Sequence, residues 1–130
     1  MELGPIQKAW LKNLREHPER QMQDQLGRLT PDGGYEACCL GEALLTLHRA
    51  QGTEDSDMFN RDDTLYDHNA MDTLESSYDE LGLHDETGSF LHERLDDEAS
   101  LAEANDAGYS WLAIADFIEE NPETVFSRSV

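Results

Sequence analysis

The run GEALLTLHR (residues 41–49) carries apolar side chains over a wide face of a helix. A surface helix of a globular protein normally shows a single apolar stripe, with polar residues on the opposite side. Here Ala43, Leu44, Leu45 and Leu47 cover more than one stripe. We therefore expect a second helix over residues 42–49, opened by Gly41, that forms the central element of the core.

Two elements are predicted on the N-terminal side of this helix. A first helix is expected over residues 5–16, with Pro5 at its first position and Pro18 just beyond its end. Residues 23–40 predict a β-hairpin, because TPDGG (residues 30–34) has the composition of a tight turn. Residues 35–39 would then form the returning strand.

Less regular patterns follow on the C-terminal side. Residues 50–63 contain several turn formers without a regular apolar spacing, so we expect a mobile acidic loop anchored by Met58 and Phe59. A helix is predicted over residues 70–81, ended by Gly82, from the spacing of Met71, Leu74, Tyr78 and Leu81. Residues 87–91 are expected to add a short strand to the sheet.

The last part of the chain predicts two more helices. Ser100 and Glu103 form the pattern of a capping box, and Gly108 follows as a stop signal. Ser110 is a typical cap for the next helix, which is expected to end at Pro122. The predicted fold class is α+β: a small single domain, residues 1–130, mainly helical and packed around a short antiparallel β-hairpin or sheet.

Charge is distributed very unevenly along the chain. Residues 1–50 contain 7 acids and 6 bases, whereas residues 51–130 contain 22 acids and 3 bases, for a net charge of −20. Like charge at this density opposes the compact state. Nucleic acid and anionic lipid would be repelled, so we expect neither direct nucleic-acid binding nor membrane binding. There is no apolar run of membrane-spanning length, and we expect the protein to stay in the cytosol.

Metal and catalytic motifs are weak. The acids from Asp55 onward do not match a calcium loop, because Phe59 and Tyr66 fall where ligands are required. His92 and Glu93 begin like a zinc-protease helix, but Asp96 replaces the second histidine. No nucleophile motif occurs, so we predict no enzyme activity, no catalytic residue, no cofactor and no metal. Cys38 and Cys39 are poorly placed to bond each other, because neighbouring residues of a strand point to opposite faces. We expect both thiols to be reduced in the cytosol and buried, as free cysteines commonly are.

Three segments, taken in order, resemble a group of small phage and prophage proteins. These segments are WLKNLR (10–15), CCLG (38–41), and LAEANDAG (101–108) followed by SWLAIADFIE (110–119). The resemblance implies a phage or prophage origin and a compact α+β fold. It implies no activity, and the matched residues are of the kinds found in cores and caps.

The acidic residues are therefore the candidate site. Carboxylates along an elongated face can imitate the phosphates of DNA, which carries one charge per ~1.7 Å of duplex. We expect such a face to bind a basic, nucleic-acid-handling host protein and to inhibit it. The residues expected to form it are Glu54, Asp55, Asp57, Asp62, Asp63, Asp79, Glu80, Asp85, Glu86, Asp96, Asp97, Glu98, Glu119 and Glu120.

Two other readings remain open. The chain could bind or sequester a small ligand such as a nucleotide, in a pocket beside residues 38–41 and the basic first helix. The basic residues available for this are Lys8, Lys12, Arg15, Arg20 and Arg28. Alternatively, the acidity could be an adaptation to salt or to solubility, with no partner directed by charge. The oligomeric state is left open.

Overall fold

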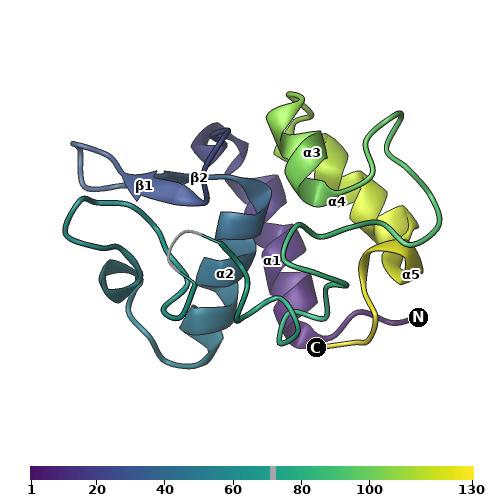
Figure 1. Ribbon diagram of the computed structural model, residues 1–130, viewed down its shortest axis with the longest axis horizontal. Helices are drawn as coiled ribbons and strands as arrows, with labels where there is room; N and C mark the ends of the chain where they lie inside the picture. Colours follow the sequence, from purple (N-terminus) through teal and green to yellow (C-terminus); the bar gives the residue numbers. More distant parts are fainter. Residues whose placement is uncertain (71–72) are drawn as a thin grey trace.

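The computed structural model describes residues 1–70 and 73–130. The core is formed by helices α1 (Pro5–Glu16), α2 (Cys39–Ala50), α3 (Leu101–Asp106), α4 (Trp111–Glu120) and α5 (Pro122–Val125). A two-stranded antiparallel sheet lies beside them, so the fold is α+β and mainly helical. Figure 1 shows α1 and α2 crossing the middle of the molecule, with the sheet on one side and α3, α4 and α5 on the other. The two chain ends lie near each other.

Helix α1 (Pro5–Glu16) matches the predicted first helix. Its buried side, which includes Trp10 and Leu14, packs against α2 and α4. The Trp10 indole N–H donates to the carbonyl of Cys39 at 2.9 Å, which satisfies the polar atom of a side chain that is 1 % exposed. The 3-10 helix η1 (Pro18–Arg20) follows directly, because Pro18 ends α1.

The hairpin pairs β1 (Gly27–Leu29) with β2 (Tyr35–Ala37) in antiparallel register, with Arg28 opposite Glu36. The expectation that the returning strand runs to residue 39 is wrong, because β2 ends at Ala37. Cys38 instead caps the next helix: its sulfur accepts the N–H of Gly41 at 3.3 Å.

Helix α2 (Cys39–Ala50) therefore begins three residues before the predicted start. Gly41 lies inside its first turn rather than opening it. A β-carbon at this position would overlap the carbonyl oxygen of Leu26, so the glycine allows the hairpin backbone to touch the helix. Every residue from 39 to 47 is buried, which confirms that α2 is the central element of the core.

The segment after α2 wraps past the sheet. The 3-10 helix η2 (Asp55–Met58) lies in the stretch predicted to be a mobile loop. Met58 is 0 % and Phe59 8 % exposed, so the predicted anchor is confirmed, while mobility stays a prediction. The Leu65 N–H then donates to the Gly27 carbonyl at 2.8 Å, which ties the loop to β1.

The predicted helix over 70–81 is wrong for the described part, and Met71 lies outside the described residues. The chain forms successive turns there: the carbonyl of Leu74 accepts the N–H groups of both Ser77 and Tyr78. The neighbouring Ser76 directs its hydroxyl to the Asp67 carboxylate. This bond ties the turns to a residue outside the segment rather than along a helix axis.

The predicted strand over 87–91 does not join the sheet. Ser89 makes a single bridge to Ser100, and the Phe90 N–H donates to the carbonyl of Ala99. Gly88 packs directly on Leu101, where an added β-carbon would lie 2.8 Å from a side-chain carbon. The segment is therefore held by α3 and by the residues just before it, Ala99 and Ser100, rather than by β1 or β2.

The C-terminal helices follow their predicted caps. They are α3 (Leu101–Asp106), α4 (Trp111–Glu120) and α5 (Pro122–Val125). The Ser100 hydroxyl accepts the N–H of Glu103 at 3.1 Å, and the Ser110 hydroxyl accepts that of Ala113 at 3.1 Å. Pro122 ends α4 as predicted and begins α5.

The last residues return to the start of the chain. The Val130 carbonyl accepts the N–H groups of Ile6 and Gln7, at the beginning of α1. The Gln7 amide donates to the carbonyl of Arg128 at 2.8 Å and is itself 1 % exposed. These bonds close the two ends of the chain against each other.

Candidate functional site

The fourteen acidic residues singled out from the sequence, which we call the acidic surface, are mostly open to solvent. Eleven are exposed, and Asp55, Asp85 and Glu98 are half-buried. They come from the loops at 54–63, 79–86 and 96–98 and from the end of α4. An exposed carboxylate in a loop keeps its contact with water, so holding its charge there costs little desolvation.

Few members of the acidic surface have a cationic partner. Within residues 1–70 and 73–130, three of the fourteen lie within 4.0 Å of a basic group. These pairs are Asp55 with Arg49 at 2.8 Å, Asp79 with Arg128 at 3.0 Å, and Glu119 with Arg15 at 2.7 Å. The other eleven carboxylates are left without compensation at that distance in the described part.

Local turns hold several of these acids outward. The Asn60 side chain accepts the N–H groups of Asp62 and Thr64 at 2.9 and 3.1 Å, which closes the turn that carries Asp62 and Asp63. Asp63 has φ 61 and Asp96 has φ 53, a left-handed conformation that Asp tolerates better than most residues. The same turns would accept Asn, which tolerates this conformation equally well.

Two further members of the acidic surface accept hydrogen bonds from uncharged groups. Burial alone would raise the pKa of Asp85, but hydrogen bonds from Ser89 and Thr87 outweigh it and lower that pKa. Asp96 accepts the hydroxyl of Tyr109, and this hydrogen bond to a carboxylate raises the pKa of Tyr109 to about 12. The hydrogen bonds therefore stabilise the charged form of Asp85.

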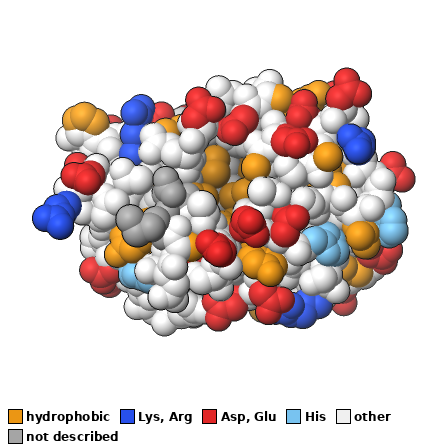
Figure 2. Space-filling view, viewed as in Figure 1, with side chains coloured by type: hydrophobic (Ala, Val, Ile, Leu, Met, Phe, Trp, Pro, Cys, Tyr) orange, Lys and Arg blue, Asp and Glu red, His pale blue; other side chains and the backbone are white. Residues whose placement is uncertain are grey.

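The acidic surface is spread over the molecule rather than gathered in one line. In Figure 1 the teal turn of η2, which carries Asp55 and Asp57, and the end of α4, which carries Glu119 and Glu120, lie toward opposite ends of the long axis. Figure 2 shows acidic side chains over much of one face, interrupted by a few basic ones. Asp96, Asp97 and Glu98 share one turn, which is closed by a bridge from Leu95 to Glu98.

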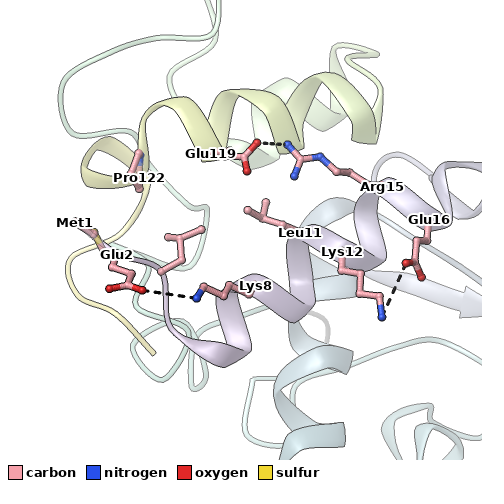
Figure 3. A pocket seen from close by; sticks show the side chains of 10 residues that line it. Met1, Glu2, Lys8, Leu11, Lys12, Arg15, Glu16, Glu119 and Pro122 are labelled. Carbon is pink, nitrogen blue, oxygen red and sulfur yellow. Dashed lines mark hydrogen bonds and ion pairs between the residues drawn. The ribbon is translucent and has the colours of Figure 1, made fainter.

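The basic N-terminal residues lie elsewhere. Lys8, Lys12 and Arg15 line an open groove of about 580 Å³ between α1, the chain start and the end of α4, with Leu11 among the lining side chains. Figure 3 shows each of these three cations facing an acid: Lys8 faces Glu2, Lys12 faces Glu16 and Arg15 faces Glu119. Arg20 and Arg28 are outside the groove and contact Tyr35 and Glu36.

A slot beside residues 38–41 also exists, but not next to the basic helix. Cys38 and Leu40 line a slot of about 190 Å³ that shares no lining residue with the α1 groove. In the described residues, these two features therefore line separate cavities. Both thiols are free and buried, as predicted, and burial raises the pKa of Cys38 to about 11 and that of Cys39 well above its usual value.

A buried polar network was missed from the sequence. The Glu42 carboxylate is 0 % exposed and accepts the Tyr35 hydroxyl at 2.6 Å. Arg49 donates to the same hydroxyl at 2.9 Å and makes a two-pronged pair with Asp55 at 2.8 and 3.0 Å. Burial raises the pKa of Glu42, with the Tyr35 and Arg49 contacts acting against it. A glutamate inside an apolar helical run is the sequence signal for this network.

The histidines do not assemble a metal centre in the described residues, where no group of three or more His, Cys, Asp or Glu is arranged to hold an ion. His68 lies beside His48, with ring centroids 5.8 Å apart. His92 is exposed.

Comparison with known proteins finds no matching family, no matching curated protein and no matching solved structure. Among residues 1–70 and 73–130, none of the helices combines the length and apolar character needed to cross a membrane.

Proposed function

We propose that this chain is an acidic phage-type protein that binds and inhibits a basic, nucleic-acid-handling host protein in the host cytosol by DNA mimicry. The observation that carries the proposal is the acidic surface itself: eleven of its fourteen carboxylates are exposed, and nine of these eleven have no basic group within 4.0 Å among the described residues. Charge that is neither paired nor buried contributes nothing to folding, and it raises the free energy of the compact state through self-repulsion.

The proposed partner follows from this charge. A groove that binds DNA presents Lys and Arg to the phosphates, and neutralising the phosphates releases counterions from the DNA. Exposed carboxylates on mobile side chains can replace those phosphates and accept the same charge-assisted hydrogen bonds. Association would be steered by long-range attraction, so it would be fast and strongly dependent on salt.

The test compares two variants of equal net charge. The first neutralises four members of the acidic surface at turns that tolerate Asn, namely Asp62→Asn, Asp63→Asn, Asp96→Asn and Asp97→Asn. The control neutralises four exposed acids outside it, namely Glu2→Gln, Glu16→Gln, Glu19→Gln and Glu123→Gln. Wild type and both variants are used as baits in bacterial lysate, at low salt and at ~0.5 M salt, where the Debye length is about 4 Å. Captured proteins are then challenged with duplex DNA.

DNA mimicry predicts that wild type and the control variant capture a discrete basic protein, whereas the first variant does not. Duplex DNA and high salt should each release the captured protein. Equal loss with both variants would show that only total charge matters. Capture of no partner at either salt would favour an acidic, salt-adapted or soluble protein without a charge-directed partner.

A second candidate function rests on the α1 groove. Its volume of about 580 Å³ falls within the range of small-molecule sites, and Lys8, Lys12 and Arg15 could bind an anionic group such as a nucleotide phosphate. The neighbouring acids oppose this, because each cation already faces a carboxylate. Thermal unfolding with a panel of nucleotides tests the idea: a shift that Lys8→Gln with Lys12→Gln removes would support it, and no shift with any nucleotide would contradict it.

A further inference from the structure

The slot beside Cys38 is an apolar recess opened at the surface. Its apolar lining comes from Leu26, Cys38, Leu40, Leu74 and Ala102, which belong to four separate segments of the chain. The Cys38 thiol is neutral near pH 7, since burial raises its pKa to about 11, so it contributes an apolar wall. Figure 2 shows a hollow with apolar atoms near the middle of the face.

The mouth of the slot is acidic. Asp24, Glu86 and Asp106 line it together with the apolar side chains, and all three are exposed. The Asp24 N–H donates to the Asp106 carboxylate at 3.0 Å, which holds two sides of the mouth together. No described residue makes an ion pair with any of these three carboxylates within 4.0 Å. Acidic side chains surround the hollow in Figure 2.

The size of the slot restricts what can enter it. A volume of about 190 Å³ is below the ~300–1,000 Å³ of sites for drug-sized ligands. It corresponds to roughly six water molecules at ~30 Å³ each. One long side chain fits this space, whereas a nucleotide does not, and the acidic mouth would repel its phosphates.

We infer that the slot receives one basic side chain of the partner, with its methylene stem against the apolar wall and its charged head among Asp24, Glu86 and Asp106. This inference rests on the proposed function and adds a specific anchor to it. Lysine and arginine commonly bury their stems along apolar surface while the head stays in a polar environment. Interfaces concentrate binding energy in such central pockets, with polar contacts around them. A purely electrostatic DNA mimic would have no need of the stem.

Stem length is therefore the variable to test. The probes are two short peptides of equal length and charge, one with lysine as its basic residue and one with 2,4-diaminobutyric acid, which has two fewer methylenes. Affinities are measured by calorimetry in mildly acidic buffer, so that every amine is protonated. Ala102→Phe fills the slot without changing charge, and Ala9→Phe places the same side chain at an exposed position of α1 outside it.

We expect wild type and Ala9→Phe to bind the lysine peptide about tenfold more tightly than the shorter analogue, from the burial of two more methylenes. Ala102→Phe should bind both peptides equally. Circular dichroism checks that this variant folds. A second variant keeps the test valid if Ala102→Phe does not fold. It combines Asp24→Asn, Glu86→Gln and Asp106→Asn, and its control combines Glu2→Gln, Glu16→Gln and Glu123→Gln. The second variant should lower the affinity for the lysine peptide more than its control does.

The outcomes separate the two proposals. Equal, salt-sensitive binding of both peptides to wild type would overturn the slot and leave the acidic surface as an electrostatic DNA mimic. Absence of binding to either peptide at low salt would overturn both, because an acidic surface that ignores basic chains has no basis for mimicry.

Discussion

The Tyr35 hydroxyl donates a hydrogen bond to the Glu42 carboxylate at 2.6 Å and thereby links the hairpin to the central helix. Arg20 and Arg49 both donate to the same hydroxyl, at 3.0 and 2.9 Å. The network balances the charge of Glu42, which is the only acidic residue with 0 % exposure among the described residues. Without these partners the charge on Glu42 would have to be lost or solvated.

Tyr35→Phe should destabilise the protein by about 2 kcal/mol, because it removes a donor from a buried carboxylate and an acceptor from two guanidinium groups. Urea unfolding followed by circular dichroism measures the change. Tyr109→Phe is the matched control, since its hydroxyl bonds Asp96 at the surface, and it should change stability by less than ~0.5 kcal/mol. Equal losses in both variants would show that the network contributes nothing specific.

Glu42→Gln should alter the pH dependence of stability. Burial raises the pKa of Glu42 above its usual 4.5 in the folded state. The folded protein therefore binds more protons than the unfolded chain over that interval, and the contribution of Glu42 to stability falls as pH rises from about 4.5 through the raised pKa. As pH rises over this window, the free energy of unfolding of wild type should fall relative to that of Glu42→Gln. Parallel curves would contradict a raised pKa.

Gly41→Ala should cost about 3 kcal/mol, because the new β-carbon would overlap the backbone oxygen of Leu26 and force α2 away from the hairpin. Gly34→Ala serves as the control. Its β-carbon would approach only the side chains of Asp32 and Thr30, at 3.3 Å, and both can move. Chemical denaturation of the two variants should therefore give clearly different midpoints, and similar midpoints would refute the close approach.

Cys38 should resist alkylation in the folded protein. Its pKa of about 11 leaves roughly one thiolate in ten thousand at pH 7, and the side chain is 8 % exposed. Mass spectrometry after iodoacetamide treatment should show no rapid modification in native buffer and complete modification in denaturant. Fast labelling under native conditions would mean that the slot opens widely enough to expose the sulfur.

Helices with strong local signals were predictable. Residues 5–16 were bounded by two prolines, and Ser100, Ser110 and Pro122 marked the ends of the C-terminal helices, because capping and proline chemistry act within a few residues. The segment 73–82 was not, since the same apolar spacing that predicts a helix also suits a series of buried turns. There the Ser76 bond to Asp67 involves a residue outside the segment.

The candidate site divides in the same way. The exposure of the acidic surface followed from its composition, because charged loop residues are rarely buried without a partner. The slot could not be predicted from the sequence. Leu26, Leu40 and Ala102 are far apart in the chain and meet only when α2, α3 and the hairpin pack together around the core.

By itself, the sequence determined the helix boundaries set by caps and prolines, the burial of α2 and the excess of negative charge, since each depends on residue type and short-range spacing. The tertiary structure alone decided that Glu42 meets Tyr35 and Arg49, and that Asp24, Glu86 and Asp106 line one recess. These features join side chains whose meeting no short-range rule specifies. The chain brings them together because burying the apolar side chains of the core leaves few arrangements that also satisfy the buried polar groups.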